Sequence, residues 1–284
     1  VKAGENINIV GSVDSESTEK HKSSSGFFKS KESIDIKYDE TINVSNFISG
    51  NNMNVEAGNN INVVGSNVVS DKELNLEAGN NVVISSGLEG SSEHHESIKT
   101  GFLGLSGRYE KDKEINYKNV GSYVGATEDI NIKANNNVNV IASDVESGKD
   151  INISAGKDVN IVAGDDITKK ESEKHKTKTS IFGSVKDLNF EVGLKTEASK
   201  NQSTSLDTKV TGSNILAGGD VNISSNKDIN IEASNIEGKN TNLHAENELN
   251  ITGRDEIHSS TIKNEKEEIK ITAGVDLGGI KDTV

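Results

Sequence analysis

The chain has 284 residues and a formal net charge of −14, with 31% hydrophobic and 4% aromatic residues and no Pro, Cys or Trp. This composition excludes a disulfide framework, thiol chemistry and a thick core filled with aromatic rings. The negative charge argues against nucleic acid and acidic lipid surfaces as partners, because binding either one requires clustered Lys and Arg. β-Branched Ile and Val dominate the apolar residues, which predicts thin all-β structure.

The N-terminus carries no recognisable targeting signal. The chain begins Val1-Lys2 without an initiator Met and has no apolar region of a signal peptide, and no apolar run approaches the roughly 18 residues of a membrane helix. We therefore expect residues 1–284 to be a single fragment from the interior of a longer protein.

Residues at about 14 to 45 are predicted to form a polar β-hairpin. They contain Glu19-Lys20-His21, and Phe27 and Phe28 follow, with Phe28 seven residues after the histidine. Alternation of apolar and polar residues comes next, which is typical of a strand with one apolar face. Its apolar members are Ile34, Ile36 and Tyr38.

A unit of an apolar residue, Asn and a second apolar residue is repeated at regular offsets, with Val83 in place of Asn in one copy. The starting positions 53, 61, 74 and 82 differ by 8, 13 and 8, so a pair of units recurs with a period of about 21. The copies are Met53-Asn54-Val55, Ile61-Asn62-Val63, Leu74-Asn75-Leu76 and Val82-Val83-Ile84.

The repeat is interrupted at about 87 to 119 by a stretch that resembles the first interruption. It contains Glu93-His94-His95, and Phe102 again stands seven residues after the last histidine. The repeat then resumes with the same 8, 13 and 8 spacing, so two independent blocks agree on the period. The copies are Ile130-Asn131-Ile132, Val138-Asn139-Val140, Ile151-Asn152-Ile153 and Val159-Asn160-Ile161.

A third interruption is expected at about 164 to 211, with Glu173-Lys174-His175 and Phe182 at the same offset. Its apolar residues also alternate, at Leu188, Phe190, Val192 and Leu194. A third block of the repeat follows as Val221-Asn222-Ile223, Ile229-Asn230-Ile231 and Leu249-Asn250-Ile251. A partial fourth interruption at 256–284 starts with Glu256-Ile257-His258, but residue 265 is Glu in place of Phe, so we expect it to be degraded or truncated.

Single apolar residues in the longer gaps between units, Val68, Val145 and Ile236, indicate a third strand in each coil. Three short strands and three tight corners make a triangular coil, and stacked coils pair each strand with those above and below. The sequence therefore predicts an all-β fold, a right-handed parallel β-helix with coils of about 21 residues and extruded β-hairpin inserts. The absence of Pro agrees, since nearly every residue in a stacked coil donates its backbone N–H.

Alternation within each strand predicts which side chains face the core. The positions expected to be buried are Val55, Leu76, Ile132, Ile153 and Ile223, and those expected to point outward are Asn54, Asn75, Asn131, Asn152, Asn222 and Asn230. The asparagines are expected to stack as amide ladders between coils, and a sugar-binding surface is the less favoured interpretation. The ends of the inserts, near 86 and 120 and near 163 and 212, are expected to approach one another.

The inserts supply the candidate interaction residues, which are His21, Phe27, Phe28, His95, Phe102, His175 and Phe182. A Glu-x-His pair offers too few ligands for zinc, and the neighbouring lysines repel a cation, so we expect no metal and no cofactor. Protonation of these histidines at about pH 6 would change the charge of all three inserts, although ordinary surface histidines explain them better. With two arginines and no Trp, the chain lacks the side chains of β-helical polysaccharide enzymes, so we expect neither an enzyme nor a small-molecule substrate.

The tandem units resemble the haemagglutinin repeats of two-partner-secretion exoproteins, the filamentous haemagglutinins and the contact-dependent growth inhibition effectors. The unit from Asp150 to Ile161 carries this resemblance, which covers almost the whole chain. The inserts add to it, because polar runs lead into Gly26-Phe27-Phe28, Gly101-Phe102-Leu103-Gly104 and Ile181-Phe182-Gly183, as in the more C-terminal repeat region of those effectors. The secretion domain and the toxin of such proteins are missing from this sequence.

The resemblance implies a segment of a secreted or cell-surface bacterial filament, exported through an outer-membrane transporter partner. In growth inhibition effectors the corresponding region is associated with delivery of a C-terminal toxin across the target cell's outer membrane, which is the leading hypothesis. Adhesion to a host or bacterial surface receptor through the hairpin tips is the alternative. The segment from 187 to 195 alternates over nearly the length of a membrane-spanning strand, which is roughly 9 to 11 residues, but an amphipathic hairpin packed on the flank of the β-helix fits equally well.

Overall fold

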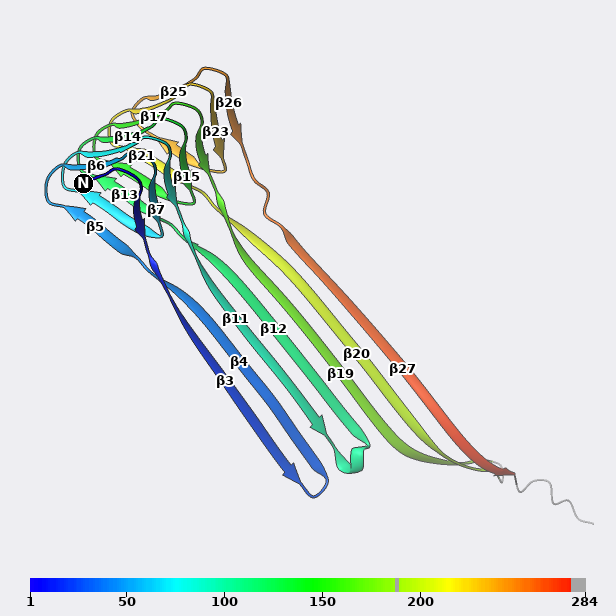
Figure 1. Ribbon diagram of the computed structural model, residues 1–284. Coiled ribbons are helices and arrows are strands. Elements are labelled where there is room, and N and C mark those ends of the chain that lie inside the picture. Colours follow the sequence, from blue (N-terminus) through cyan, green and yellow to red (C-terminus); the bar gives the residue numbers. More distant parts are fainter. Residues whose placement is uncertain (187–188, 277–284) are drawn as a thin grey trace, which may run out of the picture.

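The computed structural model describes residues 1–186 and 189–276, and in these residues three parallel sheets surround one core, as in a β-helix (Figure 1). The first parallel sheet contains β1 (Lys2–Ala3), β6 (Met53–Ala57), β9 (Leu74–Ala78), β14 (Ile130–Ala134), β17 (Ile151–Ala155), β22 (Val221–Ser225) and β25 (Thr241–Ala245). The second contains β2 (Ile7–Val10), β7 (Ile61–Val64), β10 (Val82–Ser85), β15 (Val138–Ile141), β18 (Val159–Val162), β23 (Asp228–Glu232) and β26 (Glu248–Thr252). The third contains β5 (Ser45–Ser49), β8 (Ser66–Ser70), β13 (Tyr123–Ala126), β16 (Asp144–Ser147), β21 (Asn214–Ala217) and β24 (Asn235–Glu237).

The interior of this solenoid is narrow and aliphatic. The predicted core positions are confirmed, since Val55, Leu76, Ile132, Ile153 and Ile223 are each 1% exposed. The predicted third-strand residues Val68 and Val145 are fully buried, and Ile236 packs against the same core. In each of these strands only alternate side chains point inward, so the core stays narrow.

The outward asparagines form the predicted amide ladders. The Nδ2 group of Asn75 donates to Oδ1 of Asn54 at 2.8 Å, and Asn152 donates to Asn131 at 2.9 Å. Asn131 donates to Asn75 at 2.9 Å although an insert lies between them in the chain, so the ladder continues past that insert. Because each amide is engaged by its neighbour, stabilisation of the stacked coils accounts for these residues.

The hairpins leave the solenoid at one corner, between the second and third parallel sheets. In coils without a hairpin a single residue turns this corner with positive φ, as in Gly65 (51°), Ala142 (45°) and Ala233 (44°). A ladder of buried serines, which was not predicted from the sequence, follows the corner. The backbone N–H of Ser66 donates to Oγ of Ser122 at 3.2 Å, and that of Ser122 donates to Oγ of Ser143 at 3.0 Å. These bonds satisfy backbone groups that the core hides from water.

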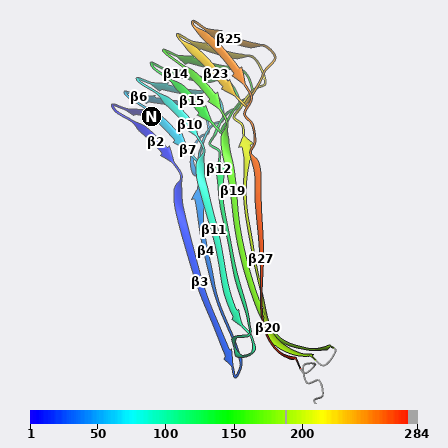
Figure 2. The ribbon, with the colours of Figure 1, turned by 90° about the vertical axis from the view of Figure 1, so that its right-hand side faces the viewer.

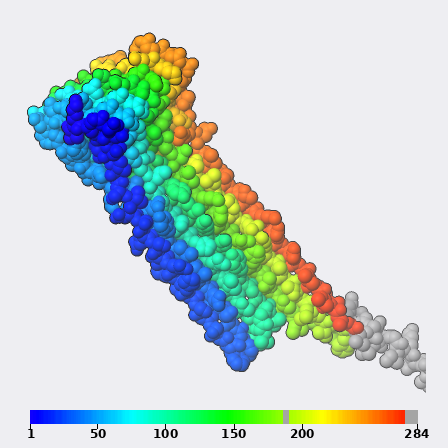
Figure 3. Space-filling view, in the orientation of Figure 1, coloured from blue at the N-terminus to red at the C-terminus, as the bar shows by residue number. Residues whose placement is uncertain are grey.

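The inserts form one antiparallel sheet, called here the hairpin sheet, which runs away from the solenoid as a single layer (Figure 2). Its strands lie side by side in chain order, as the space-filling view shows (Figure 3). They are β3 (Ser12–Gly26), β4 (Lys29–Asn43), β11 (Gly87–Thr100), β12 (Ser106–Val120), β19 (Gly164–Lys186), β20 (Asn189–Thr211) and β27 (His258–Asp276), and a short 3₁₀ turn, η1 (Phe102–Gly104), joins β11 to β12. We call the end farthest from the solenoid the distal end.

The continuity of the hairpin sheet follows from a match of spacings. Coils with a hairpin alternate with coils that have a one-residue corner. Two antiparallel strands occupy about 9.6 Å, which is also the rise of two stacked coils. Neighbouring hairpins therefore meet edge to edge, and β4 pairs with β11, β12 with β19, and β20 with β27. The sequence predicted extruded hairpins but did not predict that they pair with one another.

The ends of the inserts meet as predicted, since Gly87 is the register partner of Val120 and Gly164 that of Thr211. The described part of the fourth insert, which was expected to be degraded or truncated, is one unbroken strand, β27, paired with β20. Strand pairing depends on the backbone and on compatible side chains, and Glu265 lies opposite Lys200 where Phe is missing. Residues 277–284 of that insert lie outside the described residues.

Candidate functional site

The predicted histidines are held by carboxylates of the hairpin sheet. Nε2 of His21 lies 2.5 Å from Glu19, and Nε2 of His175 lies 2.7 Å from Glu173, within the Glu-x-His pairs. His95 instead contacts Asp35 on the neighbouring hairpin, at 2.5 Å from Nδ1 to Oδ1. This hydrogen bond lowers the pKa of Asp35. Each histidine is thus hydrogen-bonded to a carboxylate within the sheet. Within residues 1–186 and 189–276 no group of three acidic or His side chains is placed to hold a metal ion.

The three histidines are not brought together in one site. Side chains of directly paired residues share a face, and faces alternate along each strand. Strand pairing aligns His21 with Glu173, four strands away. His175 is two residues from Glu173 on the same strand, so His21 and His175 lie on one face but four strands apart. His95 lies one row away and therefore on the opposite face.

The predicted phenylalanines divide into two groups. Phe27 and Phe28 form the tip of the first hairpin, and their ring centroids are 4.4 Å apart. Phe28 also packs on Phe102 of the second tip at 4.7 Å, while Phe27 remains 93% exposed. Phe182 lies within β19, before the turn, and its ring packs over Gly193 of the neighbouring strand. A Cβ added to Gly193 would stand 2.7 Å from this ring. Lys270 also stands 4.6 Å over this ring, so Phe182 is largely engaged within the sheet.

The distal parts of β19, β20 and β27 extend beyond the other hairpins and carry an exposed apolar surface on one face (Figure 1). Register puts Leu194 opposite both Ile181 and Ile271, so the alternating residues of three strands share this face. We call it the distal apolar patch, and its members, between 45% and 71% exposed, are Ile181, Val185, Phe190, Val192, Leu194, Ile269 and Ile271. The alternative of packing on the flank of the β-helix is wrong for this segment, while Leu188 lies outside the described residues.

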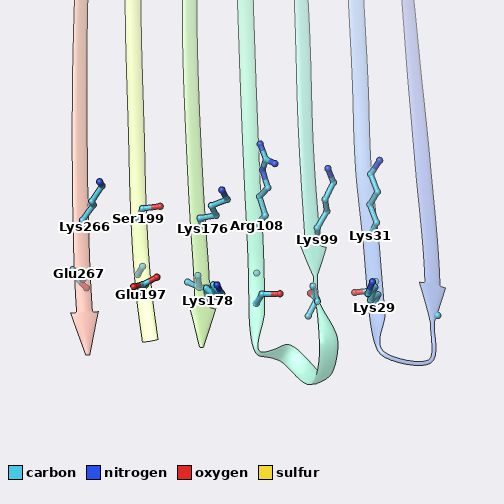
Figure 4. Close-up of a pocket in the computed structure, with 18 of the residues that line it drawn as sticks. Lys29, Lys31, Lys99, Arg108, Lys176, Lys178, Glu197, Ser199, Lys266 and Glu267 are labelled. Carbon is cyan, nitrogen blue, oxygen red and sulfur yellow. The ribbon is translucent and has the colours of Figure 1, made fainter. Parts of the chain in front are cut away.

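The opposite face carries a feature that was not predicted from the sequence, a row of cations from five strands. Register pairs Lys31 with Lys99, Lys99 with Arg108, and Arg108 with Lys176, and Ser199 separates Lys176 from Lys266. We call these five cations the basic row, and Figure 4 shows them side by side. They line a trough of about 1150 Å³. The sequence does not reveal this row, because it does not determine the register between neighbouring hairpins.

Several other cations on this face are paired with acids, whereas Lys20, Lys118 and Lys209 on the same face have no salt bridge among the described residues. Lys174 contacts Glu110 at 2.8 Å, and this hydrogen bond lowers the pKa of the Glu110 carboxyl and raises the pKa of the lysine. Lys37 contacts Glu93 at 3.7 Å, and Lys170 contacts Glu114 at 3.2 Å. Such cross-strand pairs stabilise the sheet, and the basic row differs from them because its cations lie directly opposite one another.

A sequence profile of the hemagglutinin repeat matches residues 28–102 and 103–269. The chain belongs to the hemagglutinin-repeat family. Hemagglutinin repeats are structural, adhesin-type elements, and membership implies a segment of a secreted or cell-surface exoprotein of the filamentous haemagglutinin type. Comparisons with curated proteins and with solved structures returned no match.

In this hemagglutinin-repeat chain the profile matches follow the hairpins. The first match begins at Phe28 in one tip and ends at Phe102 in the next, and the second continues from there into β27. The matched unit therefore includes both the coils and the strands that leave them. Among the described residues, no helix has the length and apolar character that crossing a membrane requires.

Proposed function

We propose that this hemagglutinin-repeat segment is a non-catalytic scaffold that helps to deliver a C-terminal toxin across the outer membrane of a target cell. In this proposal the full-length exoprotein is exported through an outer-membrane transporter partner and acts at the cell surface. The observation that supports delivery is the distal apolar patch, which lies at the end of the sheet farthest from the solenoid.

The patch has the character of a membrane-contacting surface. Ile181, Val185 and Ile271 are 71%, 67% and 66% exposed, and contiguous apolar surface of this kind is unfavourable in water. Transfer of the same side chains into hydrocarbon is favourable by about 25 cal/mol for each Å² removed from water. The strands that carry the patch extend past the first two hairpin tips, so they would meet a membrane first.

The test uses a full-length effector that contains this segment and measures toxin entry separately from binding to target cells. The variant Val192→Thr, Leu194→Thr, Ile271→Thr keeps β-branched or β-compatible residues but removes much of the apolar surface. We expect toxin entry to fall at least tenfold while cell binding stays unchanged. The matched control is Val13→Thr with Ile262→Thr, which are exposed in the same sheet but outside the patch. Normal entry by the patch variant would contradict the proposal.

Adhesion is the second candidate, and Phe27 favours it because an aromatic ring that is 93% exposed at a hairpin tip is suited to contact a receptor. Under this alternative, Phe27→Ser weakens binding to target cells without a separate defect in entry. The same pair of measurements distinguishes the two functions, because the patch variant then has no effect of its own.

The finer features of the architecture are also part of the proposal. We infer that the coils wind in the right-handed sense, because crossovers between parallel strands are right-handed in nearly all proteins. We further infer that each coil, without its insert, has the length of the sequence repeat, about 21 residues. The whole chain is inferred to form one β-helical unit. A crystal structure with a left-handed path or two separate cores would contradict this part.

A further inference from the structure

We propose that the basic row and its trough form a binding site for a phosphate-bearing glycan, the head group of a phosphorylated glycolipid on the target surface. The inference rests on the proposed function in that it names what the hairpin sheet meets at a target cell. It rests on different residues from the distal apolar patch, which lies on the opposite face.

The basic row concentrates unneutralised charge. Five cations cross six neighbouring strands, a distance of about 24 Å at the usual strand spacing of about 4.8 Å. Among the described residues, Arg108 has an acidic partner, Glu110 at 3.6 Å, whereas the four lysines of the row make no salt bridge. Like charges directly opposite each other destabilise a sheet, so folding does not account for the row.

Two of the three acids in the trough lining are already engaged by a lysine. Glu197 and Glu268 stand on its β20 and β27 side, and Lys195 contacts them at 2.7 and 3.2 Å. Two further cations, Lys29 and Lys178, line the trough beside the row. The local charge is therefore positive although the whole chain carries −14, and the net charge does not exclude an anionic ligand at this surface.

The lining between the cations has the chemistry of a sugar-binding surface. It consists of small hydroxyl, Gly and Ala residues, such as Ser24, Thr100 and Ser199, with no aromatic or large aliphatic side chain. Hydroxyl groups donate to and accept from sugar hydroxyls, while Arg and Lys bind phosphate oxygens. The absence of aromatic platforms in this lining argues against single-stranded nucleic acid, whose bases stack on such rings. A phosphorylated glycan fits both parts of the lining.

The test measures binding of the 284-residue chain to lipopolysaccharide micelles and to the same material after removal of its phosphates. The row variant is Lys99→Gln with Lys176→Gln. The matched control is Lys37→Gln with Lys170→Gln, which removes the same charge from the same face at positions paired with acids. We expect the row variant to bind at least tenfold more weakly than the parent, the control to bind within about twofold of it, and dephosphorylated micelles to bind at least tenfold more weakly than intact ones.

Two further measurements separate the sources of the phosphate and the roles of the residues. If the phosphorylated oligosaccharide freed of lipid competes, the head group alone is the ligand, and if it does not, the assembled glycolipid surface is required. In both cases the row variant must lose the binding for the proposal to hold. Melting temperature distinguishes a binding role from a structural one, because the row variant should be as stable as the parent or more stable, while the control loses ion pairs.

The proposal is overturned if the row variant binds like the parent, if dephosphorylated micelles bind equally well, or if a DNA oligonucleotide is preferred. These outcomes leave the proposed function intact when the distal patch variant still blocks toxin entry. Conversely, toxin entry could be normal with the patch variant while the glycan binding described here is still observed. That result would support this site and contradict toxin delivery through the patch.

Discussion

The solenoid and the hairpin sheet are built from the same chain by stacking strands at the same spacing, yet they are stabilised differently. The strands of the inner coils bury alternate side chains, most of them aliphatic, and residues such as Ile61, Ile130 and Ile151 have no exposed surface. The hairpin sheet is a single layer whose side chains are mostly half-buried or exposed on both faces. Ion pairs between strands, rather than a core, connect its side chains.

This difference shows how a sheet without a core acquires a defined register. Two-sided polar strands specify register weakly, because a slip by one residue moves no apolar face into water. Here the solenoid fixes the base of every hairpin, as the pairs Gly87 with Val120 and Gly164 with Thr211 show. The sheet therefore inherits its register from coils whose own register is set by burial.

The largest effect is expected from a charge in the solenoid core. Ile153→Asp places a carboxylate where the native side chain is 1% exposed, and burial of an unpaired charge should lower the free energy of unfolding by about 4 kcal/mol or more. Urea unfolding followed by circular dichroism measures this. Ser154→Asp, one position away and outward, is the control and should change little. Equal tolerance of both would show that the coils do not depend on a dry core.

A smaller loss is expected at the serine ladder. Ser143→Ala removes the oxygen that accepts the N–H of Ser122 at 3.0 Å, and the orphaned buried donor should cost about 1–3 kcal/mol. The outward Ser224→Ala is the control. If the two variants unfold at the same urea concentration, the ladder does not contribute to the corner.

Acid should loosen the hairpin sheet before the solenoid. In the sheet, His95 lowers the pKa of Asp35, Lys174 that of Glu110 and His175 that of Glu173. A carboxyl whose folded pKa is lowered stabilises the fold above its ordinary pKa, and this contribution is lost as pH falls through the lowered value. The ordinary values are 3.8 for Asp and 4.5 for Glu, so the loss starts below about pH 4.5. Hydrogen exchange, corrected for its intrinsic pH dependence, should accelerate more in the hairpins than in the coils, and the reverse order would contradict this division.

The smallest effect on the solenoid is expected when a whole hairpin is removed. Replacing residues 86–121 by one glycine joins β10 to Ser122 as Gly65 joins β7 to Ser66. Because solenoid stability is approximately a sum over neighbouring coils, the melting temperature of the core should shift by less than about 4 °C. Unfolding of the coils in this variant would show that the hairpins hold the solenoid together.

Comparison of the inserts shows which part of the candidate site the sequence could not predict, namely the positions of the phenylalanines within their hairpins. The seven-residue offset correctly related Phe28, Phe102 and Phe182 in sequence, but it did not place them equivalently. β3 has 15 residues and β19 has 23, so Phe28 is at a tip while Phe182 lies within a strand. Strand length depends on where pairing ends, which a single aromatic residue does not signal.

The sequence by itself determined the solenoid, because the alternation within strands and the longer period between coils are local patterns that a narrow core requires. It also determined that the inserts alternate and return to their starting point. Only the tertiary structure decided which hairpins are neighbours and in what register, because that depends on equality of coil rise and strand spacing. Lys99 and Arg108 belong to one hairpin, whereas Arg108 and Lys176 belong to different hairpins and meet solely through this geometry. The basic row therefore exists only in the folded molecule.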